Sequence, residues 1–496
     1  MTDTTISRRT FLTDTATATT AGTLLAAQQT AHAKAARPKQ PDERIRIGII
    51  GPGRRGFGSH VHALVRLRDR GTPVDVVGVC DVYSVHRDRA VDYIKSKTGI
   101  TPKTCLDYHD LLADKNIDAV CIATPDHWHA KQTLDALKAG KHVYCEKPMT
   151  HTLDQSLEVM RAWKKSGLVM QVGVQGTSMP IWNRIRELLD AGKIGKVVQF
   201  QTEYARNSLA GMSRHNEITK EMTPQTIDWK RWLGVDEGLA PMMTFDRAVY
   251  GQWRCYWPFS NGMYGDLFVH RVTAFLKATG LRFPARVTGG GGIFLEYDDR
   301  DVPDVATVVA GFREGVEGLV SSTMVSQNFP LRQLIRGHHG VILLGPGVWG
   351  GKLSFEYIPE RPQVTLNHRL KRETYDVGRV PNQDDAHFTN FLEAVTDGNS
   401  AHVNNPPDLG AAAVAMVNLA IRSYREGKVF HMAPNGGPVT EGNAGWAAGW
   451  EKMSKAKAKP HHLPGWHAGD AGSLLVPFKY QKLAGPWING QPPEGS

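Results

Sequence analysis

The sequence predicts an α/β protein in two parts: a doubly wound parallel sheet, then a large, open, mostly antiparallel sheet. Three observations carry this prediction. Short apolar runs alternate with helical patterns between residues 45 and 146, which is typical of βαβ units. A glycine-rich turn directly follows the first apolar run. After residue 195, apolar and polar residues alternate with period two in several runs, which favours antiparallel strands.

Composition indicates an ordinary globular protein. The 496 residues suffice for two or more domains, and with 41% hydrophobic residues the chain can bury a large core. The formal net charge is +10, but no run of five like charges and no nucleic-acid-binding motif occurs, so no nucleic-acid partner is expected. No stretch of about 18 apolar residues occurs, so no membrane span is expected.

The cysteines predict core positions rather than cross-links. There are five, an odd number, and no two have the spacing of a zinc pair. Cys80, Cys121 and Cys145 lie in apolar, strand-like runs, where cysteine behaves as a small hydrophobic residue.

The N-terminal segment has the pattern of an export signal. The pair Arg8-Arg9 is followed by a weakly apolar stretch rich in alanine and threonine, and then by a small-x-small cleavage pattern at 31–33. The alternative is a short amphipathic helix. We expect a twin-arginine signal peptide over 1–33, a linker over 34–43, the twin-arginine translocase as a partner, and a periplasmic location.

Residues 44–170 are predicted to form a Rossmann dinucleotide-binding domain. A strand over 45–50 runs directly into a G-x-G-x-x-G turn, and a helix over 60–68 follows. This spacing gives a tight turn, lets the backbone approach a pyrophosphate, and points the N-terminus of the helix at the phosphates. The candidate cofactor contacts in the turn are Gly51, Gly53, Arg54, Arg55 and Gly56.

Asp81 is the candidate contact for the ribose of the cofactor. It ends a second strand, over 74–80, about 25 residues after Gly56, near the spacing expected for an acid that binds ribose hydroxyls. Its charge would repel a 2′-phosphate and so favours NAD. Nearby arginines, among them Arg87 and Arg89, leave NADP open as the cofactor. The alternative role of Asp81 is a helix N-cap.

A third candidate group follows the strand over 118–123. Thr124, Pro125, His127 and His129 lie where the next helix begins, beside the expected nicotinamide. Two neighbouring histidines also suggest a metal site, but no third and fourth ligand accompany them, so we expect no metal. We expect His129 to pack or form hydrogen bonds near the cofactor.

The centre of the predicted site is the run Glu146-Lys147-Pro148. An apolar strand over 142–145 delivers it to the edge of the sheet where open α/β sheets bind their ligands. Lys147 can hold a reacting hydroxyl or carbonyl oxygen there, or move a proton. Pro148 predicts a sharp turn. The alternative is a solvated Glu-Lys pair in a loop.

Residues 171–430 are predicted to form a second α/β domain for substrate binding and oligomerisation. It begins with a strand that includes Gln175 and continues with a helix over 182–189 and alternating strands. We interpret Gly289–Gly292 as a flexible break, and 385–395 as a helix that packs near the cofactor domain. The tail over 431–496, rich in Gly, Pro, Lys and Trp, has no assigned role.

Asp266 and His270 carry the candidate chemistry of this second domain. Their spacing of four would place both on one face of a helix, where the carboxylate could orient the imidazole and the imidazole could accept a hydroxyl proton. The alternative is a surface pair. Trp253, Arg254 and Tyr256 precede them and suit a sugar ring, although an aromatic core cluster would look the same.

The chain resembles the glucose–fructose oxidoreductase / inositol dehydrogenase (Gfo/Idh/MocA) family over residues 44–430. The resemblance rests on the glycine-rich turn, on 123–129, on Glu146-Lys147-Pro148, and on the segment around Asp266 and His270. Shorter matches lie at 194–197 and 232–234. The chain departs from the family at Thr273, where relatives commonly carry an aspartate, and at Arg271, where many relatives are smaller or apolar.

The resemblance implies a Rossmann domain followed by an α/β domain with a large open, mostly antiparallel sheet, whose back face often makes a dimer contact. It also implies oxidation of secondary alcohols of sugars and cyclitols with NAD or NADP, with Lys147, Asp266 and His270 at the reacting carbon. We therefore expect a homo-oligomeric, exported NAD(P)-dependent oxidoreductase acting on CH–OH groups.

Export requires a tightly held cofactor that is recycled on the enzyme, because the periplasm offers no obvious pool of free dinucleotide. One alternative is an NAD-dependent glycoside hydrolase or lyase that uses transient oxidation and elimination. Another is a non-catalytic sugar-binding protein of the same fold.

Overall fold

The computed structural model describes residues 43–207, 218–296, 300–360 and 370–442, together with Gln40, Asn216 and 212–214. The predicted signal peptide, nearly all of the predicted linker, and the tail beyond residue 442 lie outside the described residues. Within the described residues, no helix is long and apolar enough to cross a membrane.

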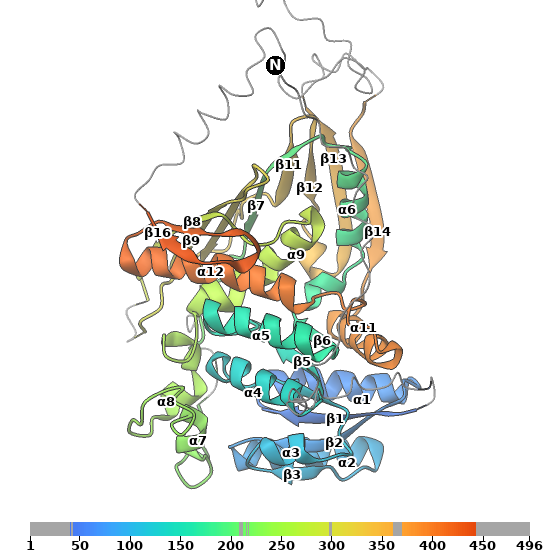
Figure 1. The fold of residues 1–496 in the computed structure, drawn as a ribbon, viewed down its shortest axis with the longest axis vertical. Coiled ribbons are helices and arrows are strands. Elements are labelled where there is room, and N and C mark those ends of the chain that lie inside the picture. The colour runs from blue at the N-terminus through green and yellow to red at the C-terminus, as the bar shows by residue number, and fades with distance from the viewer. Residues whose placement is uncertain are drawn as a thin grey trace, which may run out of the picture.

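The first sheet has six parallel strands in the order β3-β2-β1-β4-β5-β6 and lies in the lower half of Figure 1. Its strands are β1 (Ile45–Ile50), β2 (Val74–Cys80), β3 (Lys103–Cys105), β4 (Ala119–Ile122), β5 (His142–Glu146) and β6 (Met170–Gly173). The strand order reverses at β1, so the carboxyl ends of β1, β2, β4 and β5 meet at one edge, where such sheets bind ligands.

Five helices and one π-helical turn accompany this sheet. They are η1 (Gly56–Val61), α1 (His62–Asp69), α2 (Ser84–Thr98), α3 (His109–Ala113), α4 (Asp126–Lys138) and α5 (Leu153–Ser166). Strands β4 and β5 are buried along their whole length, which explains why they are apolar nearly throughout rather than alternating.

The predicted boundary between the domains, after residue 170, was wrong by a few residues. Strand β6 pairs in parallel with β5, so the first sheet extends to Gly173. A short apolar run has the same sequence pattern in either sheet, so only its strand pairing shows to which sheet it belongs.

Within the described residues, the second sheet has ten strands in the order β14-β13-β12-β11-β7-β10-β9-β8-β15-β16. They are β7 (Val197–Glu203), β8 (Arg286–Gly292), β9 (Val305–Gly311), β10 (Glu317–Thr323), β11 (Leu334–Gly337), β12 (Gly340–Leu344), β13 (Lys352–Pro359), β14 (Glu373–Arg379), β15 (Phe430–Met432) and β16 (Val439–Glu441). Every pairing that the structure describes is antiparallel except that of β7 with β10. The prediction of a large, mostly antiparallel sheet is confirmed.

One face of the second sheet is covered by helices. These are α6 (Ile181–Asp190), α9 (Val269–Thr279) and α12 (Pro407–Glu426), while α7 (Trp229–Leu233), α8 (Arg247–Gly251) and α11 (Gln383–Asp397) lie nearer the first domain (Figure 1). Short helical turns are η2 (Gln175–Ser178), η3 (Trp253–Cys255), η4 (Tyr264–Phe268), η5 (Val348–Gly350) and η6 (Pro434–Gly436). Burial alternates along β9 and β10, as period-two strands with one covered face require.

Two interpretations of the second half need correction. Gly289–Gly292 is not a break but the second half of β8, paired with β9. A Cβ at Gly289 would lie 2.1 Å from the backbone oxygen of Ala420, so glycine lets α12 approach the strand. The sheet also continues past residue 430 through β15 and β16, because β15 pairs with β8.

The two domains share their cores. Helix α11 packs on α1, and Phe388 and Phe391 are buried in one cluster with residues of β1 and β4. The prediction that this helix packs near the cofactor domain is confirmed. Helix α12 packs on α5, and in Figure 1 the pair lies between the two sheets. The domains are therefore joined by buried apolar contacts rather than by a linker alone.

All five cysteines are buried and none forms a disulfide. Cys80, Cys121 and Cys145 are at most 3% exposed and lie in β2, β4 and β5. Their predicted role as core residues is confirmed.

Candidate active site

A cavity of about 1180 Å³ lies at the carboxyl edge of the first sheet, between the two domains. Cavities for one small ligand usually measure roughly 300–1,000 Å³, so this one has room for a dinucleotide and a substrate together. The predicted residues that line it are Gly51, Gly53, Arg54, Arg55, Asp81, Thr124, Pro125, His129, Glu146, Lys147, Gln175, Trp253, Arg254, Asp266 and His270. The predicted residues outside the lining are Gly56, His127 and Tyr256.

The glycine-rich turn fits a dinucleotide phosphate. Gly51 has φ +83°, and a Cβ there would lie 2.9 Å from the backbone nitrogen of Thr124. A Cβ at Gly56 would lie 2.2 Å from the backbone oxygen of Gly51. Both positions therefore require glycine, and the resulting bare backbone can approach a pyrophosphate at the start of η1.

Asp81 is held in place at the ribose end of the cavity. Its Oδ1 accepts a hydrogen bond from the backbone N–H of Tyr83 (2.8 Å), and its Oδ2 lies 3.1 Å from Nδ1 of His86. The bond to Tyr83 resembles the helix-capping role that was the alternative, since α2 begins one residue later. Asp81 also lines the cavity, so this capping role is compatible with the predicted ribose contact.

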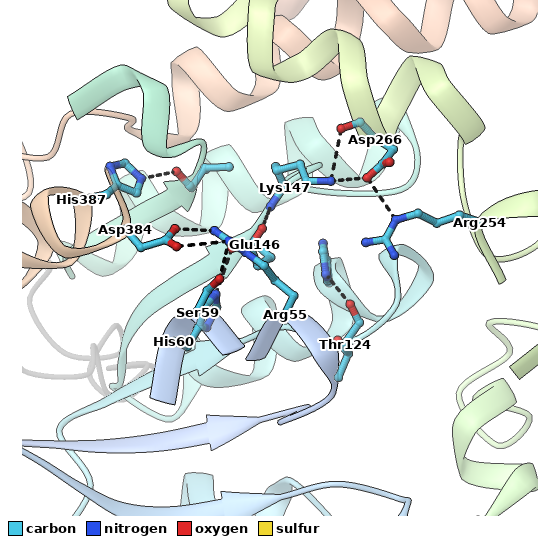
Figure 2. Close-up of polar contacts among 12 residues, drawn as sticks. Arg55, Ser59, His60, Thr124, Glu146, Lys147, Arg254, Asp266, Asp384 and His387 are labelled. Carbon is cyan, nitrogen blue, oxygen red and sulfur yellow. Dashed lines mark hydrogen bonds and ion pairs between the residues drawn. The ribbon is translucent and has the colours of Figure 1, made fainter. Parts of the chain in front are cut away.

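Arg55 and Glu146 form a buried charge network rather than pointing freely at a cofactor (Figure 2). Arg55 donates from Nε to Glu146 Oε1 (2.8 Å) and from Nη2 to Asp384 Oδ1 (2.8 Å). His60 Nε2 lies 2.9 Å from the same Glu146 oxygen. Burial opposes the charge of Glu146, but Arg55 and His60 outweigh it and hold its pKa well below the usual value. The network ties the strand that delivers Lys147 to η1 and α11.

Lys147 is held by an ion pair with Asp266 (Figure 2). Its Nζ donates to Asp266 Oδ1 (2.5 Å) and to the backbone oxygen of Asp266 (3.2 Å). Arg254 donates from Nε to the same carboxylate oxygen at 3.1 Å. Although burial disfavours its charge, the two cations keep the pKa of Asp266 well below its ordinary range. Lys147 is therefore aimed from β5 toward the second domain with its charge balanced.

His270 stands free in the cavity. Among the described residues its imidazole forms no hydrogen bond, and its ring meets the Tyr204 ring edge-on with centroids 6.1 Å apart. Burial lowers the pKa of His270 well below its usual value, and the positive charge of Lys147 lowers it further. The imidazole is thus neutral near pH 7 and has a free nitrogen that can accept a proton.

The predicted orientation of His270 by Asp266 is not what the structure has. The carboxylate bonds Lys147 and Arg254 instead. The physical reason is competition, because two cationic side chains reach this carboxylate and bind it more strongly than a neutral imidazole would.

The two neighbouring histidines lie in separate environments and do not form a metal site. His127 Nε2 lies 3.0 Å from the backbone oxygen of Trp232, inside an aromatic cluster away from the cavity. Burial lowers the pKa of His127 to about 3. The described residues contain no group of three or more potential metal ligands.

His129 clamps two loops of the cavity together. Its Nδ1 lies 2.7 Å from the backbone oxygen of Pro148, and its Nε2 lies 2.9 Å from that of Thr124. A ring that donates to two carbonyl oxygens is protonated, and although burial opposes the charge, the interactions with Cys145, Asp126 and Pro148 raise the pKa of His129 to about 9. It therefore positions the loops, as the prediction of a packing role implied.

Three of the four predicted substrate residues line the cavity, and one does not. Gln175, Trp253 and Arg254 line the cavity, and the guanidinium of Arg254 lies 4.0 Å from the centre of the Trp253 ring. Tyr256 lies outside the lining, where its hydroxyl accepts a hydrogen bond from Arg214 (3.2 Å). Trp253 also packs on the aromatic cluster, as the alternative interpretation expects, and its contact with a sugar stays a prediction.

Sequence reasoning missed His60, Asp384 and Arg206. His60 and Asp384 complete the network around Glu146, and Arg206 lines the cavity near His270. His60 lies within the predicted helix after the glycine turn, so its position in a buried first turn was a usable signal. Asp384 and Arg206 lie in loops or at element ends far along the chain, where no local pattern points at the cavity.

Residues 45–174 match the model of the Gfo/Idh/MocA group, described as an oxidoreductase family with an NAD-binding Rossmann fold. The N-terminal domain is an NAD-binding Rossmann domain. In this domain the tight turn requires Gly51 and Gly56, which let the backbone approach a phosphate. The acid positioned for the ribose of the cofactor is Asp81. Thr124, Pro125 and Lys147 line the same cavity toward the second domain.

Among curated proteins, the chain is 30% identical over 193 residues to an inositol 2-dehydrogenase/D-chiro-inositol 3-dehydrogenase of Lactiplantibacillus plantarum. This match covers 39% of the chain and 53% of the relative. It is 29% identical over 196 residues to a glycosyl hydrolase family 109 protein of Shewanella baltica, covering 38% of the chain and 39% of the relative. The chain thus spans about half, or less, of the length of these relatives.

The fold of both domains recurs in a solved structure of a levoglucosan dehydrogenase in complex with NADH and levoglucosan. The TM-score is 0.56 at 18% identity, covering 81% of this chain and all of that one. At this identity the likeness shows the fold, namely a Rossmann domain joined to a large, mostly antiparallel sheet.

Proposed function

We propose that the protein is an NAD(P)-dependent oxidoreductase that acts on a secondary hydroxyl of a sugar, glycoside or cyclitol. The observation that carries this proposal is the convergence of Lys147, Asp266 and His270 at the end of the cavity of the Rossmann domain. The similarity of 193 residues of the chain to an inositol dehydrogenase supports the substrate class.

When bound, the nicotinamide cofactor supplies the acceptor for the hydride. The neutral imidazole of His270 accepts the proton of the reacting hydroxyl, because its lowered pKa leaves a nitrogen free near pH 7. The ammonium of Lys147 donates to the same oxygen and stabilises the negative charge that develops on it. Asp266 holds Lys147 in position through an ion pair. Arg254 donates to the same carboxylate oxygen of Asp266.

The test of this assignment is Lys147→Met. Methionine keeps the volume of the side chain but removes its charge and its donors, and Arg254 still balances Asp266. We expect kcat/KM for sugar oxidation to fall by about 10²–10⁴-fold while cofactor affinity is kept. Lys193→Met is the matched control, because Lys193 also pairs with an acid, Glu373 (2.6 Å), but lies outside the cavity. A fully active Lys147→Met enzyme would refute the assignment.

We also propose that the protein is exported by the twin-arginine route to the periplasm with its cofactor already bound. The arginine pair and cleavage pattern of the sequence support export. Retention is supported by a segment of the second domain that is tied to the Rossmann loops: Arg54 Nη1 donates to Asn216 (2.5 Å), and the backbone N–H of Asp228 donates to Val82 (3.0 Å).

Cofactor retention is tested by denaturing freshly purified protein and identifying the released nucleotide by mass spectrometry. We expect one NAD or NADP per chain, and the nucleotide recovered also decides between the two cofactors. Protein that releases no nucleotide would contradict tight binding.

The second candidate function is redox-neutral cleavage of a glycoside by transient oxidation and elimination. It is favoured by the similarity of 196 residues of the chain to a glycosyl hydrolase family 109 protein. The two chemistries share His270 and Lys147 but differ in outcome. Release of reducing sugar from a glycoside with no net change in nicotinamide absorbance would establish cleavage, and net cofactor reduction would establish the dehydrogenase.

A further inference from the structure

Two arginines beside His270 have no acidic partner among the residues that the structure describes. Arg271 follows His270 on α9, is only 8% exposed, and lies between two aromatic rings. Its guanidinium carbon is 4.1 Å from the centre of the Tyr204 ring and 3.7 Å from that of Trp349. Its Nε donates to the backbone oxygen of Glu203 (3.3 Å), and within the described residues it pairs with no carboxylate.

Arg206 brings the second charge, and it lines the cavity itself. Its Nη2 donates to the hydroxyl of Tyr204 (2.6 Å), and its guanidinium lies 4.8 Å from the centre of that ring. In the part of the chain that the structure describes, this guanidinium also has no carboxylate partner. Tyr204 therefore holds Arg206, Arg271 and His270 around one ring.

The two buried acids at this end of the cavity already form ion pairs with other side chains. Asp266 is shared by Lys147 and Arg254, and Glu146 is shared by Arg55 and His60. The two additional arginines therefore leave an excess of positive charge next to the proton acceptor. Burial is the main cause that lowers the pKa of Arg271 to about 9; Tyr204 opposes this shift, and the neighbouring charge of Arg206 adds to it.

A ligand anion would remove this imbalance. A guanidinium recognises a carboxylate through two parallel hydrogen bonds, and it does so most strongly where water is partly excluded. The amide of Gln175, which lines the same cavity and has no partner among the described residues, can donate to the same anion or to a neighbouring hydroxyl. A neutral sugar would leave both arginines unmatched.

We propose that the substrate is an acidic sugar, whose carboxylate pairs directly with Arg206 while Arg271 strengthens the positive field from behind Tyr204. The inference rests on the proposed function, because Lys147 and His270 mark where the reacting hydroxyl lies. It narrows the substrate class from sugars in general to hexuronates and similar sugar acids. Arg206 is then a substrate-binding residue, and Arg271 is a positioning residue.

The test measures binding to the cofactor-loaded protein by calorimetry, so it does not depend on turnover. We expect glucuronate or galacturonate to bind at least about tenfold more tightly than glucose or galactose, with an affinity that falls as salt is added. Arg206→Gln should abolish this preference. Arg206→Lys should keep part of the preference, because it retains the charge but not the planar fork.

Arg184→Gln is the matched control, because Arg184 lies on α6 outside the cavity and pairs with Glu187. It should leave the preference intact. Equal binding of neutral and acidic sugars, or tighter binding of hexose 6-phosphates than of hexuronates, would overturn the inference. Hydride transfer from a neutral sugar would in that case leave the proposed function standing. Tight hexuronate binding without hydride transfer from any sugar would support the acidic-ligand site and contradict the proposed oxidoreductase function.

Discussion

His270 is the residue on which the proposed chemistry depends most, and its environment predicts its pH behaviour. It must be neutral to accept a proton. Burial, and then the charge of Lys147, lower its pKa well below 6.5, so it stays neutral to a lower pH than a free histidine would.

We therefore expect kcat/KM to stay constant as pH falls through 6.5 and to decline only below that value. The measurement is a pH profile of kcat/KM for cofactor reduction between about pH 4.5 and 8. The variant His270→Gln should lose activity at every pH without losing cofactor binding. An acid limb at or above pH 6.5 would mean that another group accepts the proton.

Helix α11 is the element that links the second domain to the first. Its N-terminal turn carries Asp384, which pairs with Arg55, and Asp385, which is buried and accepts hydrogen bonds from Arg66 (2.6 Å) and Arg70 (3.0 Å) of the α1 region. The same helix buries Phe388 beneath the Rossmann sheet. Docking of α11 therefore combines apolar burial with charges that fix its position.

Asp385→Ala should lower the free energy of unfolding by about 1–3 kcal/mol, because it leaves the half-buried Arg66 without its acid. Urea denaturation checks this value. Glu426→Ala is the control: it removes a partly exposed pair with Arg422 on α12, and it should change the free energy by less than about 0.5 kcal/mol. Equal effects of the two changes would mean that α11 is held by its apolar face alone.

At the scale of the whole molecule, two buried histidines with lowered pKa values predict how the stability of the fold depends on pH. Burial lowers the pKa of His127 to about 3 and that of His387 to about 4. In the unfolded chain both take up protons near pH 6.5, whereas the folded protein does not. Because the unfolded state then binds more protons, stability falls as pH drops below 6.5.

Between pH 6.5 and about 5 the histidines dominate this loss, because carboxylates with depressed pKa values, such as Glu146 and Asp266, take up protons in the unfolded chain only below about pH 5 and add to the loss there. We expect the melting temperature to decrease steadily over this range. His127→Gln should make the decrease shallower, because one proton fewer is gained on unfolding. A melting temperature that is constant from pH 6.5 to 4.5 would contradict this account.

The sequence by itself determined the Rossmann domain, and most of the site residues that it predicted line the cavity. The glycine turn, Asp81 and Lys147 follow their strands directly, and because parallel strands place their carboxyl ends at one edge, chain order alone predicts that these residues meet. The alternating runs likewise predicted the antiparallel sheet. These signals are local, since each depends on a few neighbouring residues.

Only the tertiary structure decided which side chains share a charge. Asp266 pairs with Lys147 and Arg254 rather than with His270, and α11 brings Asp384 from far along the chain to Arg55. The tertiary structure also decided that Gly289–Gly292 forms a strand and that Arg206 lines the cavity. Ion pairs and close backbone contacts act through space between distant segments, so their partners depend on packing that no local pattern records.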